Sequence, residues 1–327
     1  MFPHLEEKLY LYKARWKPVQ QTITNASSFS ASSTPIAFSS PPLSKLKRII
    51  LNQIEDLETL LVQNLISLQH LTMNDCPKLK SLSQGVQYLT ALQELDLSGC
   101  PVLDLGNDEH GMQWKGLKSL VSLQFTSMPK LVSLPLGLQH VTTLRELQIS
   151  DCSSLMAIPE WICNWVSLER FTINTCSSLT SLPEAMSWLT SLRVLQILYC
   201  PMLDLGNDEH GMQWKGLKSL ISLVFMGMPK LVSLPLGLQH VTTLRELQIS
   251  DCSSLMAIPE WICNWASLEQ FTINTCSGLT SLPEAMSRLT SLEMLRILDC
   301  PILLRRCEQE RGEDWPKIAH IPNRYIF

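Results

Sequence analysis

A short apolar frame that recurs along most of the chain constrains the fold more than any other feature of the sequence. The frame is an apolar residue, two variable residues, an apolar residue, one variable residue, an apolar residue, two variable residues and usually Cys. One copy consists of Leu144, Leu147, Ile149 and Cys152. Frames begin at positions 46, 68, 92, 120, 144, 168, 192, 220, 244, 268 and 292. Such regular spacing predicts a stack of eleven similar structural units.

The alternation of side chains along a β-strand explains the spacing inside the frame. Successive strand residues point to opposite faces, so the two middle apolar residues, such as Leu147 and Ile149, share one face. We expect these residues to point inward and the variable residues to point outward. One unit cannot bury its own apolar face, so stability must come from stacked neighbours. The frame resembles the leucine-rich repeat, which implies an α/β solenoid: a horseshoe with a concave parallel β-sheet and an irregular or short-helical convex side.

A second, longer repeat is superimposed on the first. Residues 101–200 and 201–300 align without a gap and differ at only thirteen positions. In the numbering of the first copy, these positions are 102, 121, 124, 126, 127, 166, 170, 178, 188, 193, 194, 196 and 199. No inward frame position differs. The near-identity indicates a recent duplication, which allows the two copies to be compared position by position.

Composition divides the chain outside the repeats. Residues 1–16 are interpreted as a degraded repeat, because Leu5, Leu9 and Leu11 approach the frame. Residues 17–44 are rich in Ser and are predicted to be a flexible linker, since such a segment buries too little apolar surface to offset chain entropy. Residues 45–304 are assigned to the repeat array. Residues 305–327 are predicted to cap it, with Trp315 as an anchor.

Charge and hydropathy exclude several classes of protein. The formal net charge is −4, which does not favour a nucleic-acid-binding protein, because such proteins carry a clustered positive excess. No apolar run approaches the roughly 20 residues that span a bilayer. The N-terminus lacks the apolar region of a secretory signal, so we expect a cytoplasmic protein, with the nucleus as the second compartment.

The cysteines follow the repeat. Eight of the eleven occupy the last frame position, at 76, 100, 152, 176, 200, 252, 276 and 300. Met128 takes the same place in one copy, which favours small packed side chains inside a turn over metal ligands or a redox relay. No metal ligand and no cofactor-binding residue is predicted.

The longest units contain an insert whose composition suggests two kinds of ligand. Residues 106–116, repeated from 206, include a G-x-x-x-x-G string, but Met112 and Gln113 stand where a phosphate-binding loop needs Lys and Ser or Thr. Its Asp-Glu-His cluster lacks the spacing of a helical zinc site. We interpret both inserts as loops on the flank of the solenoid. No Cys-His or carboxylate arrangement indicates catalysis, so a non-enzymatic protein is predicted.

The outward positions of the strands are the candidate binding surface. Seven of the thirteen differences fall among sixteen such positions of the first copy, and six fall among the other eighty-four. Two hypotheses explain why the differences between the copies concentrate at exposed positions. One is drift, because exposed substitutions cost little stability, and the other is diversification of a binding surface. The convex loops are nearly unchanged, which favours diversification. The candidate protein-binding residues are Gln124, Thr126, Glu146, Gln148, Asp151, Arg170, Asn174, Gln196, Tyr199, Met226, Glu246, Gln248, Asp251, Gln270, Asn274, Arg296 and Asp299.

Several phrases carry a more specific resemblance. The turns Leu182-Pro183-Glu184-Ala185-Met186 and Cys76-Pro77-Lys78-Leu79, and the ending Asp314-Trp315-Pro316-Lys317-Ile318, are similar to the leucine-rich-repeat region of plant nucleotide-binding disease-resistance proteins. The resemblance covers about residues 45–327 and implies that the repeats sense a pathogen effector or a guarded host protein. The family's nucleotide switch has no counterpart here, so a nucleotide-binding domain on another chain is a further candidate partner. The alternative is a general signalling scaffold of the Ras-group type, although those repeats are more uniform in length.

Overall fold

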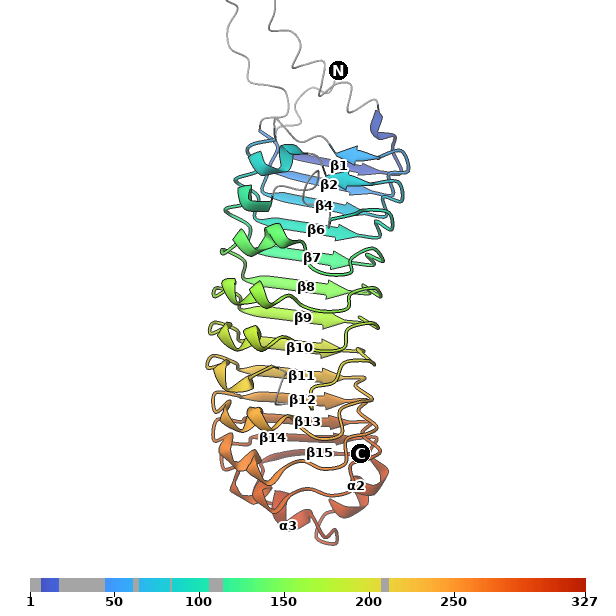
Figure 1. Ribbon diagram of the computed structural model, residues 1–327. Coiled ribbons are helices and arrows are strands. Elements are labelled where there is room, and N and C mark those ends of the chain that lie inside the picture. The colour runs from blue at the N-terminus through green and yellow to red at the C-terminus, as the bar shows by residue number, and fades with distance from the viewer. Residues whose placement is uncertain (1–6, 18–44, 61–64, 83, 106–113, 207–211) are drawn as a thin grey trace, which may run out of the picture. The chain divides into compact units, whose positions relative to one another are not determined.

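The computed structural model describes residues 7–17, 45–60, 65–82, 84–105, 114–206 and 212–327. Leu5, all but the first residue of the predicted linker, residues 106–113 of the first insert and residues 207–211 of the second lie outside these ranges. The chain divides into two compact units, Met1–Cys152 and Ser153–Phe327. Both are stacks of coils in which each turn of the chain contributes one strand to a parallel sheet (Figure 1).

In the described part of the first unit, six parallel strands of the main sheet pair in chain order. They are β1 (Lys8–Tyr12), β2 (Arg48–Asn52), β4 (His70–Asn74), β6 (Glu94–Ser98), β7 (Ser122–Thr126) and β8 (Glu146–Ser150). A small second sheet pairs β3 (Thr59–Leu60) with β5 (Ser81–Leu82). The 3₁₀ helices are η1 (Gln84–Tyr88), η2 (Trp114–Gly116) and η3 (Leu136–His140).

The second unit contains seven parallel strands, also paired in chain order. They are β9 (Arg170–Asn174), β10 (Val194–Leu198), β11 (Ser222–Met226), β12 (Glu246–Ser250), β13 (Gln270–Asn274), β14 (Met294–Leu298) and β15 (Asn323–Ile326). Its 3₁₀ helices are η4 (Glu160–Asn164), η5 (Glu184–Trp188), η6 (Trp214–Gly216), η7 (Leu236–His240), η8 (Glu260–Asn264) and η9 (Glu284–Arg288). Two short α-helices, α2 (Pro301–Arg306) and α3 (Trp315–Ile318), precede the last strand.

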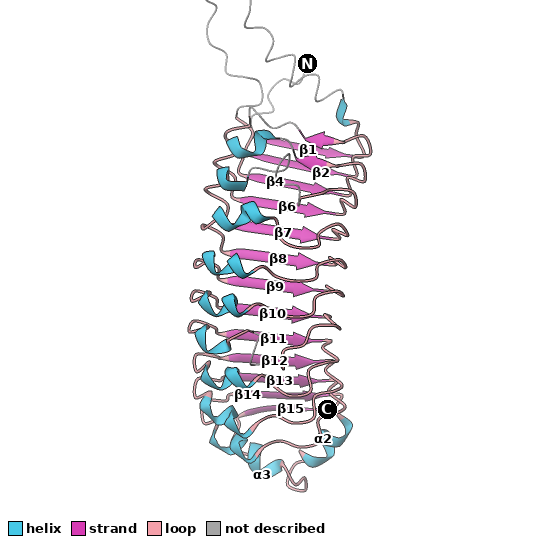
Figure 2. Cartoon of the chain, viewed as in Figure 1, coloured by secondary structure: helices cyan, strands magenta, loops and turns pink. Residues whose placement is uncertain are grey.

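In most of the described coils the side opposite the sheet contains a 3₁₀ helix, and the sequence explains why (Figure 2). In the coil after β8, Pro159 has extended backbone and its carbonyl accepts from the N–H of Ile162 at 3.1 Å. The next bonds run from Trp165 to Ile162 and from Leu168 to Trp165, each three residues apart. Proline cannot continue a preceding helix, and the i, i+3 pattern places Ile162, Trp165 and Leu168 on the inner side.

The core of each unit consists of the predicted inward residues. Leu147, Ile149 and Cys152 are fully buried, and so are their counterparts in the coils of β2, β4, β6, β7 and β9 to β14. Large aromatic side chains are buried in several coils, for example Trp114, whose ring meets Phe125 edge to face with 6.4 Å between the ring centroids. Burial of each Leu or Ile contributes about 1.5–3 kcal/mol relative to exposure. The solenoid prediction is confirmed.

The C-terminal segment closes the second unit through a buried acidic residue. Asp314 is fully buried, whereas the predicted anchor Trp315 is only half-buried, with the guanidinium of Arg324 4.9 Å from its ring centroid. The hydrogen bonds of the Asp314 carboxylate hold this segment in place, and the predicted anchor Trp315 contacts Arg324 beside it. Within the described ranges, no helix is long and apolar enough to cross a bilayer.

Candidate functional site

Each coil presents four side chains on one side of the sheet. In β13 the second and fourth residues, Phe271 and Ile273, are buried, and the first, third and fifth face solvent. The residue after each strand of a regular coil adopts a left-handed conformation, with φ of 50–63°. In the second unit its N–H donates to the last carbonyl of the next strand, as from Tyr199 to Met226 at 2.6 Å. We call the side formed by these four positions the sheet face.

None of the candidate residues predicted from the sequence is buried. In the first unit Gln124, Thr126, Glu146 and Gln148 are half-buried and Asp151 is exposed. In the second unit the exposed candidates are Arg170, Tyr199, Glu246, Asp251, Gln270 and Asp299. The half-buried candidates are Asn174, Gln196, Met226, Gln248, Asn274 and Arg296. Their placement on the sheet face shows that the register of the frame was predicted correctly.

Three positions of the sheet face are buried although the alternation predicts outward side chains. Ser150 and Ser250 are 4% and 0% exposed, and Val224 is 8% exposed. The amide of Gln248 donates to the hydroxyl of Ser250 at 3.2 Å, and Gln148 makes the same bond in the first unit. A small hydroxyl under a long amide side chain is shielded from solvent even when it points outward.

The first unit also carries polar groups on its sheet face that the sequence comparison did not single out. His70 and Glu94 pair at 2.6 Å between Nδ1 and Oε2. Asp96, in the middle of β6, is half-buried, and burial raises the pKa of its carboxyl group. These residues lie before the duplicated block, so comparing the copies could not reveal them. In the sequence, only their position within the repeated frame indicated that these residues lie on the sheet face.

The second unit has a mixed surface in which charged groups flank apolar ones. Arg170 lies on β9, and Glu246 on β12 accepts from the hydroxyl of Ser222 at 3.0 Å. Farther along, the guanidinium of Arg296 lies 5.6 Å from the ring centroid of Tyr325 on β15. Polar, charged and aromatic groups on one rigid sheet are suited to contact with another macromolecule.

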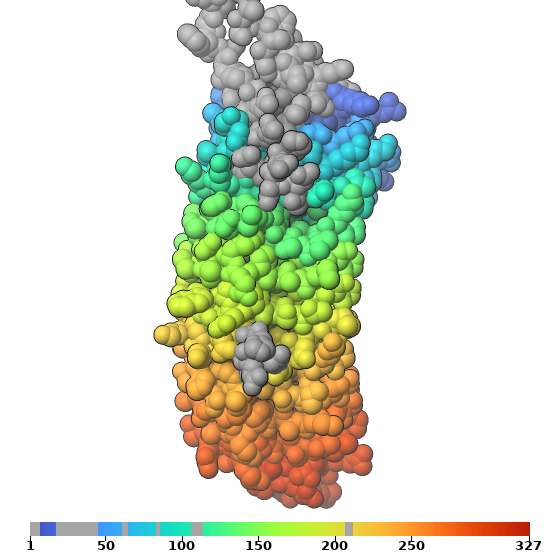
Figure 3. Space-filling model, viewed as in Figure 1, coloured from blue at the N-terminus to red at the C-terminus, as the bar shows by residue number. Residues whose placement is uncertain are grey.

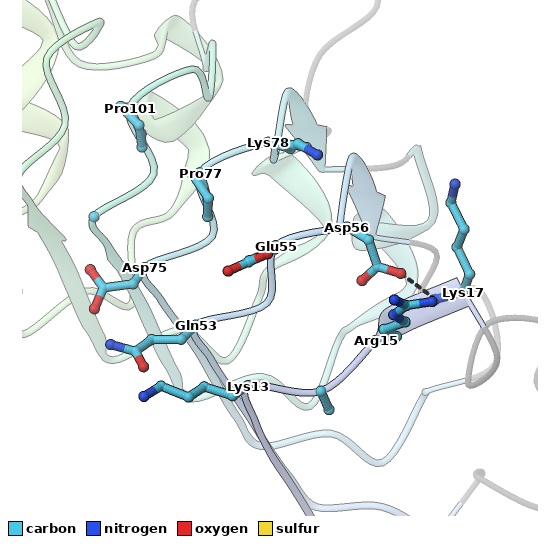
Figure 4. A pocket seen from close by; sticks show the side chains of 12 residues that line it. Lys13, Arg15, Lys17, Gln53, Glu55, Asp56, Asp75, Pro77, Lys78 and Pro101 are labelled. Atoms are coloured by element: carbon cyan, nitrogen blue, oxygen red, sulfur yellow. Dashed lines mark hydrogen bonds between the residues drawn. The ribbon is translucent and has the colours of Figure 1, made fainter.

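A cavity of about 950 Å³ lies beside the strand ends of the first unit (Figure 4). Lys13, Gln53 and Asp75 border it at the left-handed positions, and Glu55 comes from the following turn. One wall is structural, because Asp56 accepts from the backbone N–H of Trp16 at 2.6 Å. Charges of both signs line an open hollow, and they form no arrangement of a nucleophile with a base and an orienting group.

The turn cysteines act as hydrogen-bond donors to the strands. The thiol of Cys152 lies 3.4 Å from the carbonyl oxygen of Ser150, and Cys252 makes the same contact at 3.3 Å. All eight are buried. Within the described part of the chain, no three His, Cys, Asp or Glu side chains are grouped so that they could hold a metal ion.

Known structures resemble this arrangement. The leucine-rich repeat domain of the type III effector XCV3220 (XopL) aligns over 88% of this chain and 82% of its own, at 20% identity and a TM-score of 0.58. The structure of the Toll–Spatzle complex, from Drosophila, aligns over 90% of this chain and 40% of that chain, at 14% identity and a TM-score of 0.62. The chain has a leucine-rich-repeat fold. No protein-family model and no curated protein matches the sequence.

The leucine-rich-repeat architecture explains where the two copies differ. Of the thirteen differing positions, none is buried in the first copy, and only Val224 is buried in the second. Seven of them, namely 124, 126, 127, 170, 194, 196 and 199, lie on the sheet face. The space-filling view shows the surface atoms of successive repeats packed against one another within each unit (Figure 3). An altered residue in the packed core would disturb its neighbours.

Proposed function

We propose that this protein is a non-enzymatic recognition module whose sheet face binds another protein. The single observation that carries the proposal is the concentration of differences between the two copies on that face. Several exchanges alter charge, as between Arg170 and Gln270 or between Tyr199 and Asp299. Such changes alter binding specificity and leave the core of a solenoid intact.

We further propose that the bound protein is a pathogen effector or a guarded host protein in plant defence, encountered in the cytoplasm or nucleus. The turn phrases and the C-terminal segment support this, because they resemble the repeat region of plant nucleotide-binding resistance proteins. The sheet face supports it too, since a rigid surface of mixed chemistry suits a folded protein better than a small ligand. A nucleotide-binding domain on another chain is the second partner that the resemblance suggests.

Affinity purification from healthy and infected plant tissue tests this function. The face variant carries Arg170→Ala, Gln196→Ala, Glu246→Ala and Gln270→Ala, all on the sheet face. The matched control carries Val232→Ala, Leu236→Ala, Met256→Ala and Arg288→Ala, four exposed positions away from the strands.

We expect the native chain and the control to recover a common protein partner that the face variant loses. The face variant should unfold at the same temperature as the native chain, because exposed substitutions cost little stability. Equal recovery by all three chains would show that the sheet face is not the binding surface.

A further inference from the structure

The differences between the two copies meet at one place on the sheet. Strand β10 belongs to the last repeat of the first copy, and β11 belongs to the first repeat of the second. These strands pair in parallel register, with Gln196 beside Val224 and Leu198 beside Met226. Seven pairs of equivalent sheet-face positions differ between the copies. In six of these pairs, one of the two residues lies on β10, on β11 or in the turn that follows either strand, at 194, 196, 199, 224, 226 and 227.

The residues that meet there are largely apolar. Val194 and Leu198 come from β10, and Val224 and Met226 from β11. In the first copy, the places of Val224 and Met226 are taken by Gln124 and Thr126, whose side chains are hydrogen-bonded at 3.2 Å. Where the first copy has a hydrogen-bonded polar pair, the second copy thus has two apolar side chains, the buried Val224 and the half-buried Met226. We call Val194, Leu198, Val224 and Met226 the junction patch.

An aromatic ring borders the junction patch and is positioned by a glycine. A Cβ atom placed on Gly227 would lie 2.3 Å from Cδ1 of Tyr199, so the ring lies across Gly227. The first copy has Ser127 in place of Gly227, in the same left-handed conformation. The backbone therefore accepts a side chain here, and it is the ring of Tyr199 that requires glycine.

A carboxylate lies beyond the ring, in the series of left-handed positions that follow successive strands. Asp251 is exposed and occupies the left-handed position after β12, next to Gly227. Strand spacing places it about 10 Å from the backbone of Tyr199, and the ring extends into the space between. An aromatic face beside a carboxylate attracts a cation, because the ring quadrupole and the negative charge act in the same direction.

We propose that the junction patch, Tyr199 and Asp251 form the anchor of the sheet face, and that they bind a protein segment presenting an apolar side chain next to an arginine or lysine. This inference rests on the proposed function and specifies its site and partner chemistry. The apolar side chain covers the half-buried Val194, Leu198 and Met226, which surround the buried Val224, and the cation lies over Tyr199 beside Asp251. A neutral or acidic segment would leave that carboxylate without a counter-charge.

The two copies supply substitutions that the fold already accommodates. The patch variant combines Tyr199→Thr, Val224→Gln and Met226→Thr, because Thr175, Gln124 and Thr126 occupy the equivalent places in other repeats. The second variant is Gly227→Ser, which displaces the ring without adding charge. The control is Trp188→Arg, an exposed aromatic residue on η5 that is replaced by its counterpart in the second copy.

The probe is a phage-displayed library of random 12-residue peptides, selected on the full native chain. We expect enriched peptides to share a large apolar residue within a few positions of Arg or Lys. The patch variant should bind a selected peptide about tenfold more weakly or worse, and Gly227→Ser about threefold to tenfold more weakly. Trp188→Arg should remain within about twofold of the native chain. Replacing the basic residue of the peptide with citrulline should weaken binding to the native chain and have little effect on the patch variant.

Several outcomes would overturn the proposal. The first is that no peptides are enriched. The second is that the enriched peptides lack a basic residue, and the third is that they bind the patch variant as tightly as the native chain. If those peptides still lose affinity when Arg170, Gln196, Glu246 and Gln270 are changed to Ala, the sheet face binds proteins but its anchor lies elsewhere. A native dimer that the patch variant converts to a monomer in sedimentation velocity would identify a second copy as the occupant instead.

Discussion

At the residue scale, the cysteine that closes eight of the coils shows how a single position meets two physical demands. The position is fully buried, so its side chain must be uncharged and well packed, as Met128 also is, and a strand carbonyl lies within reach, so a donor is useful. A thiol satisfies both. Cys163 and Cys263 lie in η4 and η8 instead, and both are half-exposed.

This difference predicts the reactivity of the thiols. Burial raises the pKa of Cys152 to about 11 and that of Cys307 to about 12, so both remain protonated near neutral pH. We expect two thiols of the native protein, Cys163 and Cys263, to react rapidly with an aromatic disulfide reagent at pH 8, and the other nine only after unfolding in urea. Mass spectrometry of the labelled peptides checks the assignment. Rapid labelling of Cys152 or Cys252 would mean that the coils open on the timescale of the reaction.

At the scale of elements, the cap formed by α2, α3 and β15 depends on one network around Asp314. Its carboxylate accepts from Arg306 Nε at 3.0 Å, from Lys317 Nζ at 2.9 Å and from the backbone N–H of Leu282 at 2.9 Å. Burial by itself raises the pKa of Asp314, but the hydrogen bonds from Arg306, Leu282 and Lys317 outweigh it and hold the pKa below its ordinary value. The cap is therefore joined to the coil at Leu282 by a charged contact.

Removal of this charge should loosen the cap. Asp314→Asn removes the buried counter-charge of Arg306 and Lys317, which keep the exposed partners Glu313 and Glu284, and we expect a loss of about 2 kcal/mol in unfolding free energy at pH 7. Because the pKa of Asp314 is lower in the folded state, its stabilisation is fully present above the ordinary Asp value of about 4 and is lost as the pH falls through the folded value. The difference between native and variant in urea unfolding should thus shrink below about pH 4. A difference that stays constant down to pH 2 would contradict this account.

At the scale of the whole molecule, the duplication gives a direct test of how far the repeats are independent. Deleting residues 101–200 joins Cys100 to Pro201 and restores the Cys-Pro pair found at both copy boundaries. Because a solenoid is stabilised by neighbouring coils alone, we expect the shortened chain to fold with an unchanged circular dichroism signal per residue. It would lose Val194, Leu198 and Tyr199, and with them the binding of junction-patch peptides. A collapsed or aggregated product would show that contacts beyond nearest neighbours are required.

Much of this architecture could be predicted from local sequence. The strand positions, the inward side chains and the outward register follow from the frame, because side-chain alternation and turn closure depend on residues a few positions apart. The strand β15 was not predicted, since Asn323–Ile326 lacks the frame and pairs with β14 only through the folded cap. The burial of Ser250 was missed for a similar reason, because it depends on the conformation of Gln248 above it.

The sequence by itself therefore determined the stacked repeat, its apolar interior and the positions at which the two copies were free to diverge. Only the tertiary structure decided which groups meet: the ring of Tyr199 across Gly227, the apolar residues of β10 beside those of β11, and the carboxylate of Asp314 at the backbone N–H of Leu282. The physical reason is one of range. Periodicity encodes the direction of each side chain along its own strand, whereas its neighbours come from other coils, more than twenty residues away in the chain.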